Sequence, residues 1–243
     1  GGATTAGVVI GRAERMFMPK GERMTITDAT GREEAIAWDE TMFWNVYYVK
    51  GGFLDSEKAF EVLNGLKTYE LRVVNKAVNT LTIANALHAR PGINVYCPAL
   101  SDNMTLELPA GLFTIDMPGV DTAVFKRFFD SLEPADGLQE SLGKTHSLVL
   151  CPGLTTHSEL SPEALEEAGI APTTLRISVG LEDPRNLLMH IAEAAKAIID
   201  PAHPGFSNAF MPTEEVDSLY RSIYKDVHGR FIDSRPDSAE LLV

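Results

Sequence analysis

Residues 175–183 read LRISVGLED, and this stretch decides the fold. Its first five residues alternate between apolar and other side chains, which predicts a strand over 175–179. Asp183 followed by Pro184 supplies a helix N-cap and a proline at the first helical position, so a helix is expected to about Ile199. A strand that passes directly into a helix is typical of a mixed α/β protein.

The same alternation of elements is found upstream. Residues 68–89 carry apolar side chains at near-helical spacing, which predicts one long amphipathic helix that ends before Pro91 and Gly92. Asp121 is a suitable N-cap for a further short helix. Three segments have the apolar pattern of strands: 93–97, 112–117 and 147–150. We therefore expect an α+β domain over residues 67–200.

The two ends of the chain are less regular than this domain. Residues 1–66 begin with a short apolar strand at 7–10 and continue into a long excursion with local helix. The periodicity fades again after residue 200, and a short helix is expected over 213–227. Residues 201–243 are interpreted as an arm that packs either on its own domain or on a partner.

The composition is that of an ordinary globular protein, with 243 residues, 44% hydrophobic and 23% charged. The formal net charge of −13 disfavours nucleic acid and anionic membranes as partners. Cys97 and Cys151 have no metal-like spacing, so neither a disulfide framework nor a metal site is expected, and a reducing, cytoplasmic location fits. No apolar run is long enough for a membrane span, and no signal-peptide pattern is seen.

Arg176 lies at the centre of the predicted strand 175–179. Burial of a guanidinium among apolar residues costs free energy unless a planar anion accepts hydrogen bonds from its N–H groups. A carboxylate can accept two of these hydrogen bonds at once. Two interpretations are open: Arg176 binds the carboxylate of a ligand, or it pairs with a carboxylate of its own domain or points to solvent. Generic motifs do not decide, because the sequence has no nucleophile elbow, phosphate loop or His-Glu-x-x-His pattern.

A series of motifs in the second half of the chain resembles a known family. The motifs are FDSL at 129–132, ESLG at 140–143, SL at 147–148, PGLTTHSEL at 152–160 and LRISVGLED at 175–183. In this order and spacing they closely resemble the C-terminal domain of the Cys/Met-metabolism family of pyridoxal-phosphate enzymes. That family includes cystathionine γ-synthase, cystathionine γ-lyase, methionine γ-lyase and O-acetylhomoserine sulfhydrylase.

Two upstream segments extend this resemblance. GLKT at 65–68, together with Arg72 and Asn79, is similar to the helix pair of the family, and GVVI at 7–10 is similar to the strand just after its cofactor-binding lysine. The resemblance covers roughly residues 1–200, is weak in the excursion and does not include the final arm.

The resemblance implies a fold-type I pyridoxal-phosphate transferase. Residues 1–66 would be the end of its large cofactor-binding domain, and 67–200 its C-terminal domain. The implied cofactor is pyridoxal 5′-phosphate, and its lysine, its pyridine-binding acid and its phosphate-binding residues are expected before Gly1. No catalytic residue is then expected in this chain, which would not be a self-sufficient enzyme. The implied partners are the missing N-terminal half, further copies in a homotetramer, and a small amino-acid substrate.

The resemblance also implies substrate-binding roles for four residues. Arg176 would hold the substrate α-carboxylate, Ser141 would lie beside it, Glu140 would face the distal end of the substrate, and Thr156 would approach the substrate. The neighbouring His157 is expected to be structural. Other interpretations are open for two of these residues: Ser141 bonds its own turn, or Glu140 is a solvated surface acid.

The implied activity is γ-replacement or γ-elimination on a sulfur amino acid or an O-acylhomoserine. Thr155, Thr156 and His157 resemble the sulfhydrylase pattern, whereas ESLG at 140–143 resembles cystathionine γ-synthase and γ-lyase. The reaction, including β-elimination, the sulfur donor and the acyl group therefore stay open. An alternative is a non-catalytic partner or regulatory domain that kept the carboxylate-binding site and lost the cofactor.

Overall fold

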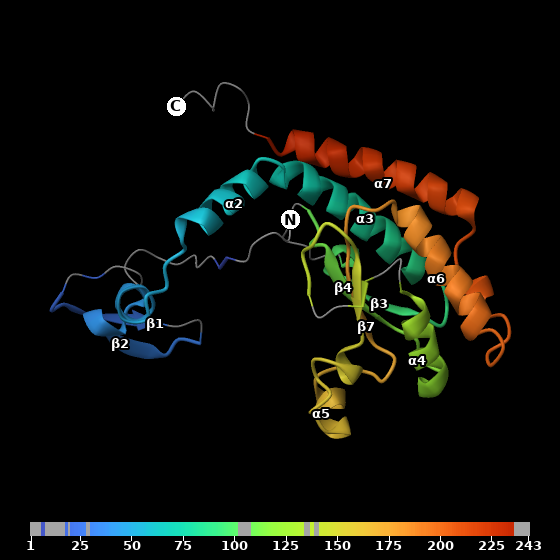
Figure 1. Cartoon of the computed structure of the whole chain (residues 1–243), viewed down its shortest axis with the longest axis horizontal. Helices are drawn as coiled ribbons and strands as arrows, with labels where there is room; N and C mark the ends of the chain where they lie inside the picture. Colours follow the sequence, from blue (N-terminus) through green and yellow to red (C-terminus); the bar gives the residue numbers. More distant parts are fainter. Residues whose placement is uncertain are drawn as a thin grey trace. The chain divides into compact units, whose positions relative to one another are not determined.

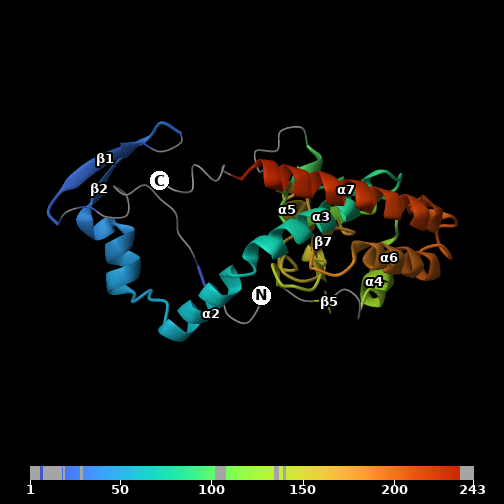
Figure 2. The same cartoon turned by 90° about the horizontal axis from the view of Figure 1, so that it is seen from above.

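The chain divides into two compact units in the computed structural model, Ala3–Leu66 and Lys67–Val243. We call them the N-terminal unit and the C-terminal unit. The structure describes residues 6–7, 18, 20–27, 30–101, 108–133, 137–138 and 141–235. Helices and strands occur in both units (Figures 1 and 2), which confirms the predicted mixed α/β class.

A five-stranded sheet forms the centre of the C-terminal unit, in the order β3-β4-β7-β6-β5. Its strands are β3 (Asn94–Tyr96), β4 (Leu112–Asp116), β5 (Gly137–Leu138), β6 (Leu148–Leu150) and β7 (Leu175–Ser178). Neighbouring strands are antiparallel, except that β5 is parallel to β6. The strand that carries Arg176, β7, is therefore the middle strand and is hydrogen-bonded on both sides.

One face of this sheet packs on helices, and the opposite face carries Arg176. Phe113 of β4, Val149 of β6 and Ile177 of β7 are cross-strand neighbours, and all three belong to the main hydrophobic core. That core also contains residues of four helices: α3 (Tyr69–His88), α4 (Thr122–Ser131), α6 (Pro184–Ile198) and, through Val216, α7 (Thr213–Asp233). Because side chains alternate along a strand, Arg176 points away from the face that contains Ile177.

Local signals explain most helix ends. Gly92, with φ of +87°, provides the left-handed turn after α3. The carboxylate of Asp183 accepts a hydrogen bond of 3.0 Å from the Arg185 backbone N–H, so the predicted cap of α6 is present. Asp121 precedes α4 as expected but makes no capping hydrogen bond. Its carboxylate instead lies 3.4 Å from Nε2 of His203.

The last helix, α7 (Thr213–Asp233), lies along α3, as Figures 1 and 2 show. Val227 is fully buried in a second core cluster with four residues of α3: Val74, Ala77, Val78 and Leu81. The helix therefore packs on its own unit, which is one of the two arrangements expected. It continues past the predicted end at Val227 because Phe231 packs against the same cluster.

Short helices complete the C-terminal unit. They are η3 (Pro98–Leu100), η4 (Pro152–Leu154), α5 (Pro162–Glu167) and η5 (Phe206–Ala209). Both cysteines are free and buried, and burial raises the pKa of the Cys97 and Cys151 thiols.

The N-terminal unit contains a hairpin followed by helices. Strands β1 (Arg23–Thr27) and β2 (Glu33–Ala37) are antiparallel. They are followed by the 3₁₀ turn η1 (Trp38–Glu40), the π-helix η2 (Phe43–Val49) and α2 (Ser56–Leu66). The expectation of local helix alone in this region was thus incomplete, because the hairpin was missed. The predicted strand at 7–10 lies outside the described residues apart from Gly7.

None of the helices that the structure describes is both long and apolar enough to cross a membrane. The same part of the chain contains no group of three or more His, Cys, Asp or Glu side chains that could hold a metal ion.

Candidate functional site

Arg176 is presented by the middle strand on the face of the sheet that does not pack on the main core. Its cross-strand neighbours are Thr114 of β4 and Leu150 of β6. The side chain is half-buried, and its Nη2 donates a hydrogen bond of 3.2 Å to the backbone carbonyl of Ser141. The structure thus brings together two of the four predicted site residues, 35 positions apart in sequence.

The guanidinium of Arg176 has no carboxylate partner among the described residues. The ion pairs between those residues involve Lys58, His203 and other arginines, at positions 90, 185, 221, 230 and 235. The guanidinium presents its N–H groups as a planar fork, and the neutral Ser141 carbonyl accepts from one of them. The positive charge of Arg176 is left without a counterion among the described residues. A carboxylate can accept from two parallel N–H groups of the fork. The arrangement is suited to an anion that comes from outside this part of the chain.

The segment that contains Ser141 is held close to β7 by further hydrogen bonds. The backbone N–H of Gly143 donates to Oγ of Ser178 at 3.1 Å, and the N–H of Leu181 donates to the carbonyl of Thr145 at 2.7 Å. Ser141 contributes its backbone carbonyl to Arg176, and this role does not depend on its hydroxyl.

Thr156 lies on the turn that follows β6 and η4. Its hydroxyl is 2.8 Å from Nδ1 of His157, and both residues are exposed. The turn is held by the His157 backbone N–H, which donates to the carbonyl of Pro152 at 2.9 Å. The described contacts do not join Thr156 to Arg176 or Ser141. Glu140 lies outside the described residues.

A group of residues to which the sequence analysis gave no role in the site surrounds the Ser141 segment. It comprises Lys76, Asn79, Ser147, Gly180 and Glu182, which share hydrogen bonds at the end of β7. One signal was available, because Asn79 is a polar residue inside the long apolar helix predicted over 68–89. A buried polar side chain at such a position needs a partner.

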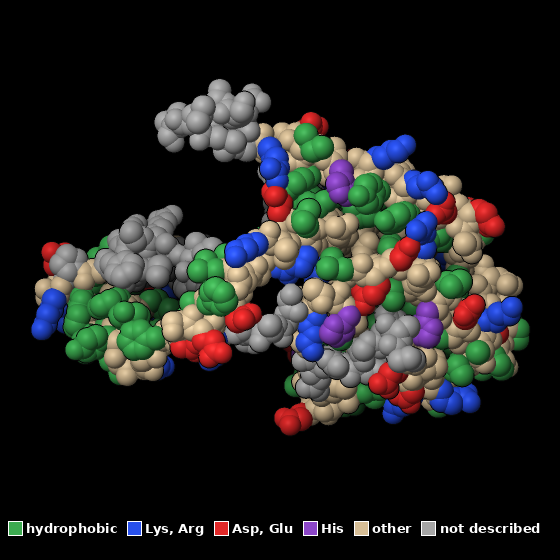
Figure 3. Space-filling model, turned by 45° about the horizontal axis from the view of Figure 1, so that its top comes forward, with side chains coloured by type: hydrophobic (Ala, Val, Ile, Leu, Met, Phe, Trp, Pro, Cys, Tyr) green, Lys and Arg blue, Asp and Glu red, His purple; other side chains and the backbone are tan. Residues whose placement is uncertain are grey.

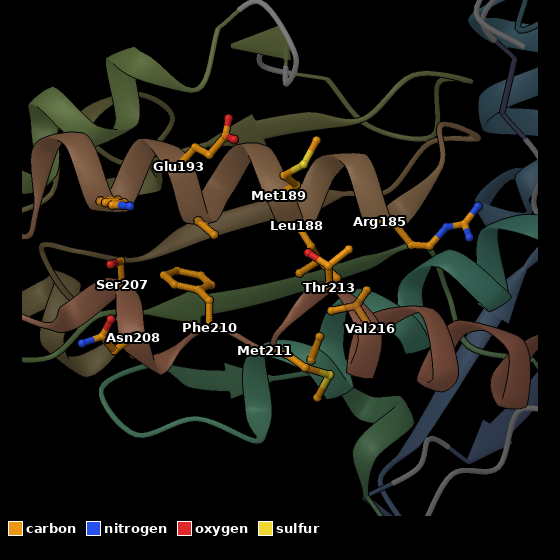
Figure 4. Close-up of a pocket in the computed structure, with 13 residues that line it drawn as sticks. Arg185, Leu188, Met189, Glu193, Ser207, Asn208, Phe210, Met211, Thr213 and Val216 are labelled. Carbon is orange, nitrogen blue, oxygen red and sulfur yellow. The ribbon is translucent and has the colours of Figure 1, made fainter.

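A separate pocket of about 320 Å³ lies between α6 and the segment that leads into α7 (Figure 4). Its lining includes Leu188 and Met189 of α6 together with Phe210, Met211 and Val216. None of the four predicted site residues lines this pocket. It is therefore not the substrate site that the sequence motifs indicate.

The C-terminal unit has the architecture found in enzymes of fold-type I. A solved structure from Campylobacter jejuni, described as an O-acetylhomoserine (thiol)-lyase, matches 64% of the chain with a TM-score of 0.56 and 29% sequence identity. That structure contains N′-pyridoxyl-lysine-5′-monophosphate and is covered over 38% of its length. The fold class predicted from the sequence is thus confirmed.

The chain belongs to the Cys/Met metabolism PLP-dependent enzyme family, whose model matches residues 5–196. The L-methionine γ-lyase of Fusobacterium nucleatum is 28% identical over 168 residues, which are 66% of this chain and 42% of that enzyme. The cystathionine γ-synthase of Escherichia coli is 32% identical over 167 residues, which are 65% of this chain and 42% of that enzyme.

These matches confirm the family and leave the particular reaction open, because the relatives are named for different reactions. The chain spans about two fifths of the length of these curated relatives. The match to the family model ends at residue 196, so α7 lies beyond it.

Proposed function

We propose that the complete protein carries out pyridoxal-phosphate-dependent γ-replacement or γ-elimination on a sulfur amino acid or an O-acylhomoserine. This chain would supply the part of the site that binds the α-carboxylate of the substrate. The observation that carries the proposal is Arg176, a half-buried guanidinium on the middle strand with no carboxylate partner among the described residues.

The proposed role of Arg176 is to bind and orient. Two N–H donors in the fork would meet the two carboxylate oxygens and fix the plane of the substrate backbone, which a single ammonium group cannot do. The Ser141 carbonyl, which accepts a hydrogen bond from Nη2, restrains the guanidinium. Pyridoxal phosphate, when bound, supplies the electron sink at the α-carbon. We propose that the lysine and the phosphate-binding residues for this cofactor precede Gly1.

Two further residues are proposed to contact the rest of the substrate. Thr156 lies on the exposed turn that follows β6 and η4, and β6 is the strand beside Arg176. We propose that the Thr156 hydroxyl approaches the bound substrate. Glu140 directly precedes Ser141 in the sequence, and we propose that it faces the distal end of the substrate side chain. There its charge would favour an ammonium group and disfavour a second carboxylate.

The surface of the N-terminal unit supports the proposed partners. Large hydrophobic side chains are exposed there, and Figure 3 shows hydrophobic side chains over much of its visible surface. Examples are Tyr48, Val49, Phe53, Phe60 and Leu63, each at least 60% exposed. Contiguous apolar surface of this kind is typical of an interface. We propose that it is covered by the N-terminal half of the large domain, in a cytoplasmic homotetramer.

The test is Arg176→Lys in the complete protein, which keeps the charge and removes the fork. Michaelis constants for L-methionine, L-cystathionine and O-acetyl-L-homoserine should rise about tenfold or more, ~1.4 kcal/mol or above. Arg127→Lys on the exposed side of α4 is the matched control and should leave them unchanged. Unaltered constants in Arg176→Lys would remove the carboxylate-binding role.

A second measurement separates the enzyme from the non-catalytic alternative. The complete protein should contain about one pyridoxal phosphate per chain, measured after release in alkali, and borohydride should fix it covalently to a lysine. A complete protein that binds no pyridoxal phosphate while it still binds an amino acid through Arg176 would be the regulatory or partner domain.

A further inference from the structure

A buried polar network joins the turn after β7 to the segment that contains Ser141. Both carboxylate oxygens of Glu182 accept hydrogen bonds from Ser147: Oε1 from the backbone N–H at 2.6 Å and Oε2 from the hydroxyl at 3.0 Å. Oγ of Ser147 in turn accepts a hydrogen bond of 2.9 Å from the backbone N–H of Gly180. Ser147 therefore bonds to both carboxylate oxygens of Glu182 and also to the backbone of the turn at Gly180.

Side chains of helix α3 also hold the turn after β7 and the Ser141 segment by hydrogen bonds. Nδ2 of Asn79, a buried side chain, donates to the backbone carbonyls of Gly180 at 3.1 Å and Glu182 at 2.8 Å. Nζ of Lys76 donates to the backbone carbonyl of Lys144 at 2.6 Å. A Cβ atom at Gly180 would overlap the Glu182 carboxylate and the adjoining backbone of the segment. The turn and the segment are therefore in direct contact and leave no room for a side chain between them.

From this network a series of contacts leads to Arg176. Residues 141–147 bond to residues 176–182 at four successive points: Ser147 with Glu182, Thr145 with Leu181, Gly143 with Ser178, and Ser141 with Arg176. Glu182 holds one end of the segment, and the carbonyl that meets the guanidinium lies at the other. A shift at Ser147 would therefore move the Ser141 carbonyl against the Arg176 fork.

We propose that Glu182 is a positioning residue, which fixes the Ser141 segment through Ser147 and so sets the orientation of the Arg176 guanidinium. This proposal rests on the proposed carboxylate-binding role of Arg176. Glu182 itself touches neither the substrate nor the reacting atoms. A carboxylate binds best to a fork that is already oriented, because no side-chain freedom is then lost on binding.

The first test is Glu182→Gln in the complete, cofactor-loaded protein. The amide offers one acceptor in place of two, so one Ser147 donor loses its partner while the size of the side chain is kept. The Michaelis constant for the amino acid that the protein turns over fastest should rise about fivefold, with kcat changed by less than about twofold. Glu167→Gln on the exposed side of α5 is the matched control and should change neither constant.

A double-mutant cycle with Arg176→Lys shows whether Glu182 acts through the arginine. If Glu182 acts through Arg176, Glu182→Gln should not change the Michaelis constant of the Arg176→Lys variant any further. Equal effects of Glu182→Gln in both backgrounds would overturn the proposal, and so would a loss of thermal stability with an unchanged Michaelis constant. If Arg176→Lys alone has no effect, the carboxylate-binding role fails first, so the two failures are distinguishable.

Discussion

The two units of the chain bury their side chains to very different extents. The C-terminal unit has a continuous core in which Phe125, Phe128 and Met117 are fully buried between sheet and helices. Among the described residues of the N-terminal unit, Met18 and Thr41 are buried. The aromatic rings of η2 stack on one another instead, with Trp44 at 4.8 Å from Tyr48.

The C-terminal unit therefore folds around its own core, whereas many apolar side chains of the described N-terminal unit are exposed. Burial of apolar surface is the main stabilising contribution to folding, so the described N-terminal unit gains much less of it than the C-terminal unit. The elements that hold Arg176 all belong to the unit with the core. The site geometry is thus supported by a packed core, whereas most of the described side chains of the N-terminal unit are exposed or only partly buried.

The largest expected effect comes from a matched pair of phenylalanines. Phe128→Ala in α4 removes a side chain that is fully buried and should lower the free energy of unfolding by about 3–5 kcal/mol. Phe60→Ala in α2 removes one that is 61% exposed and should change it by less than about 0.5 kcal/mol. Urea unfolding of the chain, followed by far-ultraviolet circular dichroism, measures both.

Tryptophan fluorescence provides an independent readout for this pair. Both tryptophans of the chain, Trp38 and Trp44, lie in the N-terminal unit, so their emission reports on that unit alone. Phe128→Ala should move the dichroism transition to lower urea and leave the fluorescence transition in place. A Phe60→Ala variant as unstable as Phe128→Ala would contradict the comparison of the two units.

The same difference explains how much of the fold could be predicted from the sequence. In the C-terminal unit, buried faces impose apolar periodicity, so the predicted helix at 68–89 and strand at 112–117 agree with α3 and β4. The hairpin of β1 and β2 was missed although Met24 and Ile26 alternate with polar residues in β1, because that pattern is short and β2 does not repeat it. Most of the described side chains of the hairpin are exposed. Strand β5 is two residues long and exists through its pairing with β6, which no local pattern reveals.

The candidate site was predictable in part for a similar reason. Arg176 stands out locally as a charge in an apolar strand, and its motif placed Ser141 near it, as the structure shows. The contact of Asn79 with Glu182 joins residues 103 positions apart, so only the folded chain brings them together. The substrate roles of Thr156 and Glu140 stay predictions.

A smaller effect is expected at the contact between α3 and α7. Val227→Ala removes two methyl groups from a fully buried position and should lower the free energy of unfolding by about 1–3 kcal/mol. Ile232→Ala in the same helix removes a side chain that is 66% exposed, and its effect should be within about 0.5 kcal/mol. If both variants unfold at the wild-type urea concentration, α7 is not part of the core of the C-terminal unit in solution.

The smallest effect concerns the ion pairs between the start of α6 and α7. Nη2 of Arg185 lies 2.6 Å from Oδ2 of Asp183, and its Nη1 bonds to Asp217. Hydrogen bonds from Arg185 lower the pKa of Asp183, and hydrogen bonds from Arg221 and Arg185 lower the pKa of Asp217. These groups are partly exposed, so the stabilisation is modest.

The pH dependence of this stabilisation follows from the direction of the pKa shifts. A carboxylate whose pKa is lower in the folded state stabilises it above the unfolded pKa of about 3.9, and the contribution is lost as the pH falls through the folded value. Arg185→Gln should therefore be less stable than wild type at about pH 7, and the difference should shrink between about pH 5 and pH 3. Arg221→Gln, which loses a bond to Asp217 alone, should show a smaller difference with the same trend. Urea midpoints at several pH values measure this difference in stability. A difference that stays constant down to about pH 3 would show that Arg185 stabilises the helices through its cation–π contact with Tyr220 rather than through the two carboxylates.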